Sequence, residues 1–286
     1  MGFHTSFKDD VNQRMHELSP LSRNVGLPVH YNVPNTNKTP DFSKNLDEQE
    51  PSIIETYKGF ENMNIKSQNS NYSVLWNRQN LSKKNLHERF TKIANYSDLK
   101  VFEILSEWIP KKYDIQVANS TPIRYFQLFD LTNQNNMFAN RGTSGIDGST
   151  STAIGSSINN NSPVLLVTGD LSFFYDMKAL WNNYTKPDFR IIIVNNQGGG
   201  IFKILPGHKE NDIFSEFIET KHNLSARNIS KMFNCNYNRV STKFGLNIAM
   251  RTFFRKSKKP KILEIKTSGI KSAKILKDYF RYLSKS

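Results

Sequence analysis

Apolar and polar residues group along the second part of the chain in blocks that predict helices and strands in turn. Residues 77–94 and 97–110 carry apolar positions at helical intervals, and Pro110 ends the second stretch. Helical stretches then alternate with short runs rich in Val and Ile, which are typical of strands buried on both faces. These runs cover residues 114–119, 136–140, 163–170, 190–196, 237–242 and 261–267. The pattern predicts a doubly wound α/β domain with a mostly parallel sheet over residues 76–286.

Residues 1–75 lack this alternation. Leu27 to Pro34 form one strand candidate, and polar sequence containing Asn and Pro follows it. Such composition cannot bury enough apolar surface to form a core, so we expect a linker or irregular structure at residues 41–75.

Composition limits the class of protein. The 286 residues are 37% hydrophobic, and none of their windows approaches the roughly 18 apolar residues of a membrane span. The chain contains one cysteine, Cys235, so it cannot form an intramolecular disulfide. We therefore expect a cytoplasmic protein without membrane insertion.

The net charge of +14 raises the hypothesis of a basic nucleic-acid-binding protein. The basic residues are scattered, however, and no long basic run is interleaved with aromatic residues. This distribution favours a solvated basic surface and no nucleic acid partner. A positive field would also attract a phosphate cofactor and anionic substrates.

Two of the predicted strands end in residues that can hold a metal ion together. VLLVTGD ends at Asp170 and RIIIVNN ends at Asn196, with room for one crossover helix between them. If the strands are parallel neighbours, both carboxyl ends lie at one edge of the sheet, where adjacent strands are about 4.8 Å apart. Carboxylate, amide and carbonyl oxygens suit Mg²⁺. The alternative is that Asp170 caps a helix.

The other predicted strand ends at this edge also carry unusual residues. Asn119, Ser120 and Arg124 follow the first strand, and the glycine-rich segment 140–155 follows the second. Glycine allows close backbone approach, and the Ser and Thr residues could cap a helix and face a phosphate. Nucleotide-binding loops of the types G-x-x-x-x-G-K-[ST] and G-x-G-x-x-G are absent from the sequence.

Other polar and aromatic residues receive simpler interpretations. We expect Asp176 on the surface or in a helix turn. We expect Trp181 in the core, together with Phe173, Phe174 and Leu180. The six histidines lack metal-ligand spacing, so none is assigned a role.

Four motifs in this order resemble a known family. GDLSFFYDMKALWNNY and RIIIVNNQGGGIF resemble the metal motif of thiamine-diphosphate enzymes, a Gly-Asp followed by a crossover unit and Asn-Asn. NRGTSGIDGSTSTAIG and GDLS narrow the resemblance to the 2-succinyl-5-enolpyruvyl-6-hydroxy-3-cyclohexene-1-carboxylate synthases (SEPHCHC synthases) of menaquinone biosynthesis. The resemblance runs from about Asn71 to the C-terminus, and it implies the fold of the diphosphate-binding domain.

The resemblance also implies roles for individual residues. Asp170, the Asn196 side chain and the Gly198 carbonyl would bind Mg²⁺ or Mn²⁺, which holds the diphosphate of thiamine diphosphate. Ile146 would be the apolar wedge under the cofactor. The full set of cofactor contacts would be Ser144, Gly145, Ile146, Asp147, Gly169, Leu171, Ser172, Ile201 and Phe202. The substrate contacts would be Asn119, Ser120, Arg124 and Arg141. The reaction would decarboxylate 2-oxoglutarate and add the remaining unit to isochorismate, and both of these substrates are anionic.

The family has three domains, and 286 residues cannot hold them at about 150 residues each. The resemblance implies that residues 1–40 are the end of the pyrimidine-binding domain and residues 41–75 a remnant of the middle domain or a linker. The glutamate that activates the cofactor would be absent, so no catalytic residue is assigned. We expect a homo-oligomer, or a split enzyme completed by a chain that carries the pyrimidine-binding domain. A catalytically dead cofactor-binding remnant is the alternative.

Overall fold

A computed structural model describes residues 71–129, 136–204 and 211–284. The chain divides into two units, Met1–Ser70 and Asn71–Ser286. Residues 1–70 lie outside the described residues. The interpretation of residues 1–40, and that of residues 41–75 as far as Ser70, therefore stay predictions. Helix α3 (Tyr72–Ile93) begins four residues before residue 76. The domain boundary that we expected at residue 76 stays a prediction. No helix in the described part of the chain combines the length and the apolar character needed to cross a membrane.

The second unit contains a six-stranded, fully parallel sheet, which confirms the predicted α/β class. Its strand order is β2-β1-β3-β4-β6-β5. The strands are β1 (Asp114–Val117), β2 (Met137–Ala139), β3 (Val164–Gly169), β4 (Arg190–Asn195), β5 (Asn236–Val240) and β6 (Lys261–Lys266). All of β4 and nearly all of β3 are buried, as their unbroken apolar runs predict. The two strands are parallel neighbours, and Gly169 pairs with Val194.

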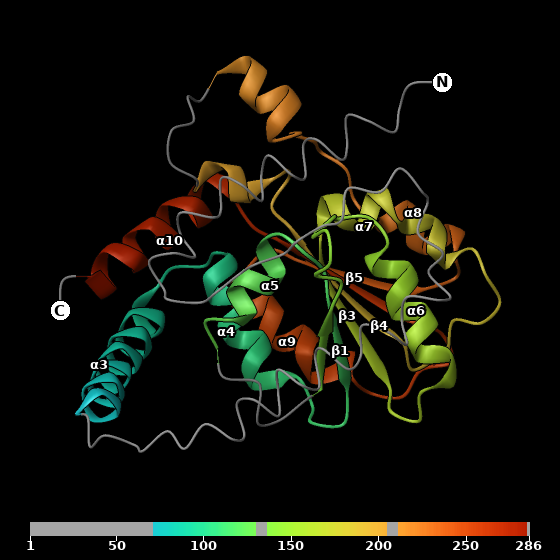
Figure 1. The fold of residues 1–286 in the computed structure, drawn as a ribbon. Helices are drawn as coiled ribbons and strands as arrows, with labels where there is room; N and C mark the ends of the chain where they lie inside the picture. Colours follow the sequence, from blue (N-terminus) through green and yellow to red (C-terminus); the bar gives the residue numbers. More distant parts are fainter. Residues whose placement is uncertain (1–70, 130–135, 205–210, 285–286) are drawn as a thin grey trace, which may run out of the picture. The chain divides into compact units, whose positions relative to one another are not determined.

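Helices cover both faces of this sheet, as seen in Figure 1. Ile192 and Val194 of β4 face one apolar cluster, and Ile191 and Ile193 face the other. The first cluster takes side chains from α4 (Asp98–Trp108), α5 (Thr121–Phe126), α9 (Lys243–Phe253) and α10 (Gly269–Ser284). The second takes them from α6 (Ser149–Asn159), α7 (Asp170–Tyr175), the 3-10 turn η1 (Met177–Leu180) and α8 (Arg227–Met232). A 3-10 helix, η2 (Gly200–Lys203), and a short π-helix, η3 (Phe214–Ile218), follow β4.

The connection from β3 to β4 differs from the single crossover helix that we expected. It consists of α7, with six residues, and η1, with four. Asp176 lies between them and is buried, because its carboxylate accepts hydrogen bonds from the Ser151 backbone N–H and hydroxyl, both at 2.7 Å. We predicted a surface or helix-turn position for Asp176. The surface position was wrong, because the side chain is buried. Trp181 is also not in the core, since it is 84% exposed.

Candidate functional site

A cavity lies at the carboxyl ends of β1, β3 and β4, the edge at which the sequence places its unusual residues. Segments after β1, β2, β3 and β4 contribute to it, together with the start of α4. Of the predicted site residues, the structure brings these to its wall: Asn119, Ser120, Ile146, Gly169, Asp170, Leu171, Ser172, Asn196, Gly198 and Phe202. Arg124, Arg141, Ser144, Gly145, Asp147 and Ile201 do not line it.

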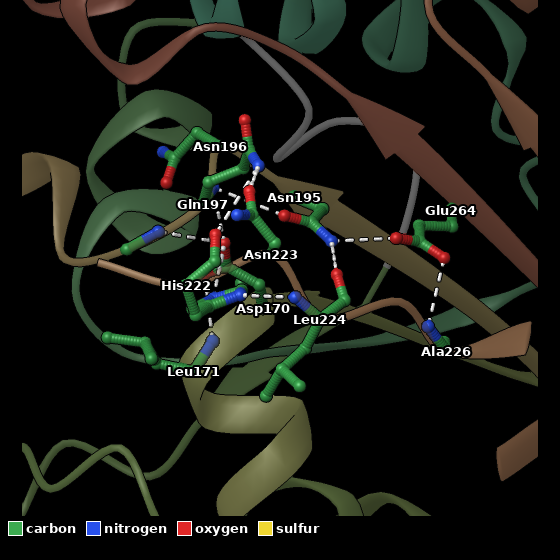
Figure 2. A network of polar contacts seen from close by, with 12 residues as sticks. Asp170, Leu171, Asn195, Asn196, Gln197, His222, Asn223, Leu224, Ala226 and Glu264 are labelled. Carbon is green, nitrogen blue, oxygen red and sulfur yellow. Dashed lines mark hydrogen bonds and ion pairs between the residues drawn. The ribbon is translucent and has the colours of Figure 1, made fainter. Parts of the chain in front are cut away.

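Asp170 ties the loop after β3 to the loop after β4. It is the first residue of α7 rather than the last residue of a strand, and it is 3% exposed. Its Oδ2 atom accepts hydrogen bonds from the backbone N–H groups of Gln197, at 2.7 Å, and Gly198, at 3.1 Å. Its Oδ1 atom accepts one from the N–H of Leu171 at 2.8 Å. Figure 2 shows this carboxylate at the centre of the polar network.

Asn196 presents an unused oxygen beside this carboxylate. Its Nδ2 atom donates to Asp98 Oδ2 at 2.9 Å, whereas its Oδ1 atom is buried and has no hydrogen-bond partner among the described residues. Burying an acceptor without a partner costs about 1–3 kcal/mol, so such an atom indicates a missing donor or cation. The Gly198 carbonyl accepts one hydrogen bond, from the Gly200 N–H at 3.0 Å, and retains its second lone pair.

This donor set fits a hard cation. One carboxylate, one amide oxygen and one backbone carbonyl are all oxygen ligands, and Mg²⁺ completes such a set with phosphate oxygens. Within residues 71–129, 136–204 and 211–284, no three His, Cys, Asp or Glu side chains cluster as a metal site of their own. A metal at this edge would therefore depend on the mixed set that the two strands provide.

Backbone conformation around the cavity is unusual. Ser120, Ser144 and Gln197 have positive φ angles of 69°, 58° and 70° without being glycine. Such conformations cost about 1–3 kcal/mol each, and they gather where a binding site needs particular geometry. Gly198 has a φ of 150°, and a Cβ atom there would lie 2.8 Å from the Glu219 carbonyl oxygen. The backbone of this loop therefore requires glycine at position 198.

The glycine-rich loop is held by Asn119, which was predicted as a substrate contact. Asn119 is 1% exposed, and its Nδ2 atom donates to the carbonyls of Asn140, at 2.5 Å, and Gly145, at 2.6 Å. Its Oδ1 atom accepts from Arg141 Nη1 at 3.0 Å. The hydroxyl of Ser172 ties the same loop to α7 by donating to the Ile146 carbonyl at 2.5 Å.

The start of α6 offers two further unpaired groups. Gly148, with a φ of 73°, is the N-cap residue, so the predicted capping by Ser or Thr side chains at this end does not occur. The hydroxyls of Ser149 and Thr150 are instead buried without a hydrogen-bond partner in the described residues. Hydroxyl and N–H groups at a helix start can bind an anion.

The two predicted substrate arginines lie outside the cavity wall. Arg124 and Arg141 are exposed, and Arg124 Nη1 donates to the Ser120 carbonyl at 2.8 Å. Each guanidinium has five N–H donors, so each keeps donors for a carboxylate beyond the contact it already makes.

Sequence reasoning missed three residues around the predicted metal ligands. His222 Nε2 lies 3.3 Å from Asp170 Oδ2, and its Nδ1 atom accepts from the Leu224 N–H at 3.1 Å, which places the proton on Nε2. Asp98 is fully buried against Asn196, and burial is the main cause that raises the pKa of its carboxyl; the Asp170 charge adds to it. Glu264 in β6 binds Asn195. All three contacts join distant parts of the sequence, and no local motif indicates them.

Comparison with known proteins defines the class to which this fold and site belong. Residues 120–265 match the family model of the thiamine pyrophosphate enzyme, C-terminal TPP binding domain. This match covers half of the chain, so the chain belongs to the thiamine pyrophosphate enzymes through a domain of this type.

The particular relatives are the SEPHCHC synthases, which confirms the resemblance read from the motifs. The synthase of Christiangramia forsetii is 46% identical over 197 residues, which make up 69% of this chain and 34% of the relative. That of Flavobacterium johnsoniae is 45% identical over 189 residues, or 66% of this chain and 34% of the relative. That of Porphyromonas gingivalis is 36% identical over 214 residues, or 74% and 37%. The chain spans about a third of the length of these relatives.

Proposed function

We propose that the edge formed by β1, β3 and β4 binds thiamine diphosphate through Mg²⁺ or Mn²⁺. Asp170, the Oδ1 atom of Asn196 and the Gly198 carbonyl would hold the metal, which in turn would hold the cofactor diphosphate. The observation that carries this proposal is the buried Asn196 Oδ1 atom. This atom has no partner among the described residues, and Asn196 lines a cavity together with Asp170, in a domain of a thiamine pyrophosphate family.

The remaining contacts to the cofactor would come from the loops around the cavity. Gly169, Leu171 and Ser172 lie at the start of α7 and line the wall, where backbone approach to the diphosphate is open. Ile146 and Phe202 are among the apolar residues of the wall. Ser144, Gly145, Asp147 and Ile201 stay proposals that rest on the family resemblance.

We propose that the reaction is that of the SEPHCHC synthases, as the names of the relatives indicate. 2-Oxoglutarate would be decarboxylated and the remaining four-carbon unit transferred to isochorismate. Thiamine diphosphate, when bound, supplies the nucleophilic carbon for this chemistry. Arg124 and Arg141 would bind substrate carboxylates, for which a planar guanidinium provides two parallel hydrogen bonds.

The assembly that we propose is cytoplasmic and completes the site with a pyrimidine-binding domain. That domain would come from a complementing polypeptide, since the chain spans only a third of its relatives. A homo-oligomer of this chain is the alternative assembly. A cofactor-binding remnant without activity is the second candidate.

Release of CO₂ from 2-oxoglutarate tests the proposal and separates the two candidates. The purified chain would be assayed alone and with the N-terminal two-thirds of the Christiangramia forsetii synthase. We expect turnover only in the mixture, and its loss when the chain carries Asp170→Ala. Binding of thiamine diphosphate without turnover in any mixture would favour the remnant. Turnover that Asp170→Ala leaves unchanged would contradict the proposed site.

A further inference from the structure

Asp98 determines which way the Asn196 amide points. Its Oδ2 atom accepts the hydrogen bond from Asn196 Nδ2 at 2.9 Å, and its side chain is 1% exposed. A carboxylate oxygen in this position is an acceptor, so it selects the NH₂ side of the amide. The carbonyl oxygen of the same amide, Oδ1, is thereby left without a hydrogen-bond partner among the described residues.

The Asp98 carboxylate is itself fixed from two further elements. Its Oδ1 atom accepts a hydrogen bond from the Thr267 hydroxyl, at 2.5 Å, just beyond the end of β6. Its backbone N–H donates to the Ser272 hydroxyl of α10 at 3.0 Å. The orientation of the amide therefore depends on contacts from α4, the end of β6 and α10. None of these elements belongs to the segments after β3 and β4 that carry the proposed metal ligands.

With its amide turned over, Asn196 would lose the hydrogen bond to Asp98. Turning the Asn196 side chain over would bring its Oδ1 atom against Oδ2 of the ionised Asp98, so two buried acceptors would face each other. The absence of a side chain at Gly200 leaves room for the amide in its present place, because a Cβ atom at that position would lie 2.9 Å from Asn196 Nδ2. Pairing acceptor with acceptor in a buried site loses a hydrogen bond and leaves both groups unsatisfied.

We propose that Asp98 is a positioning residue. It holds the Asn196 side chain with the carbonyl oxygen toward the metal ion. This inference rests on the proposed function, since it concerns the same metal site. Residues that orient metal ligands typically change metal affinity by 10–100-fold when they are removed. Asp98 lies on the cavity wall itself, and its proposed effect on the metal passes through the Asn196 amide.

Manganese affinity in three variants of the full chain tests the role of Asp98. Mn²⁺ would be titrated in the presence of thiamine diphosphate, and the free ion followed by its paramagnetic resonance signal. Asp98→Leu keeps the branching at Cγ, with a larger volume, and removes the acceptor. Asp98→Asn can turn its oxygen to Asn196 and its NH₂ to the Thr267 hydroxyl. Asp114→Ala is the matched control, because Asp114 is a buried carboxylate that binds the amides of Asn136 and Asn160 at the opposite end of β1.

We expect Asp98→Leu to weaken Mn²⁺ binding by at least about tenfold. Asp98→Asn should restore most of the affinity, and Asp114→Ala should leave it unchanged while lowering the unfolding temperature. Unchanged affinity in Asp98→Leu, or equal losses in Asp98→Leu and Asp114→Ala, would overturn the positioning role and leave the proposed function standing. No binding by the unchanged chain would overturn the proposed function and this inference together.

A crystal structure of the unchanged chain with Mg²⁺ and thiamine diphosphate provides a test that does not depend on variants that fold. We expect Asn196 Oδ1 at about 2.1 Å from the ion and Asn196 Nδ2 still within hydrogen-bond distance of Asp98. An ion bound by Asp170 with the Asn196 amide turned away from Asp98 would overturn the inference and retain the metal site.

Discussion

Glu264 and Asn195 form a buried hydrogen bond of 2.7 Å between β6 and the end of β4. The Glu264 carboxylate also accepts the Ala226 N–H, the Ser225 hydroxyl and the Tyr237 hydroxyl. Asn195 in turn donates to the Leu224 carbonyl and accepts the Gln197 N–H at 3.1 Å. Figure 2 shows that this network reaches from β6 to the N–H groups that bind Asp170. One buried carboxylate thus supports the loop that holds the proposed metal site.

Replacing Glu264 should lower stability strongly. Glu264→Ala removes the acceptor of four donors, and we expect the free energy of unfolding to fall by about 3 kcal/mol or more, because each buried orphan costs about 1–3 kcal/mol. Urea unfolding measures this change. Glu107→Ala removes an exposed glutamate and should change stability by less than about 0.5 kcal/mol. Equal effects of the two substitutions would contradict the importance of this network.

A methyl group at Gly200 should disturb the metal site more than the fold. The added Cβ atom would meet the Asn196 amide at 2.9 Å and displace the proposed ligand. We expect Gly200→Ala to weaken Mg²⁺-dependent binding of thiamine diphosphate by about tenfold, as loss of ligand positioning typically does. Gly155→Ala is the matched control, since a Cβ atom there meets nothing within 4 Å and the position is an exposed one in α6. If both variants bind the cofactor as the unchanged chain does, Asn196 is not a ligand.

Loss of Arg141 should affect the substrate more than the cofactor. In an active assembly, Arg141→Ala should raise the KM for 2-oxoglutarate or isochorismate about tenfold, because a charge-assisted hydrogen bond contributes about 1.5–3 kcal/mol. The affinity for thiamine diphosphate should stay unchanged, and Arg124→Ala should behave in the same way. Steady-state kinetics and cofactor titration measure the two quantities. A parallel loss of both would show that these arginines hold the fold of the site rather than the substrate.

The stability of the domain should decrease as the pH falls through about 6.5, partly because of His87. Burial of its ring, which lies 3.0 Å from the Tyr279 hydroxyl, lowers the pKa of His87 below its ordinary value of 6.5. The unfolded chain therefore binds this proton at a higher pH than the folded one, so protonation favours unfolding as the pH falls. His87→Phe should flatten the pH dependence of the urea midpoint in this window. An unchanged slope would exclude His87 as a contributor.

Much of the fold could be predicted because it depends on local pattern. Continuous Val and Ile runs indicate strands buried on both faces, and the physics of parallel sheets places Asp170 and Asn196 at one edge. The structure confirms the parallel pairing of β3 and β4. The broken crossover could not be predicted, because α7 ends where Asp176 turns inward to bind Ser151, a contact 25 residues away.

The support around the candidate site was hidden from the sequence for the same reason. Asp98 resembles an ordinary acidic residue in the first turn of a helix, yet it binds Asn196 at a separation of 98 residues. Glu264 occupies a strand position where a charged residue reads as a departure from the apolar pattern. A buried carboxylate inside an apolar strand was the available signal, because such a group requires partners.

Calorimetric titration of thiamine diphosphate into the full chain tests most directly whether Asp170 and Asn196 hold a metal that binds the cofactor. We expect binding with Mg²⁺ present, no binding after chelation, and loss of binding in Asp170→Ala. Asp188→Ala, which removes an exposed carboxylate, should bind as the unchanged chain does. Equal affinity in Asp170→Ala, or binding that persists without the metal, would contradict the site described here.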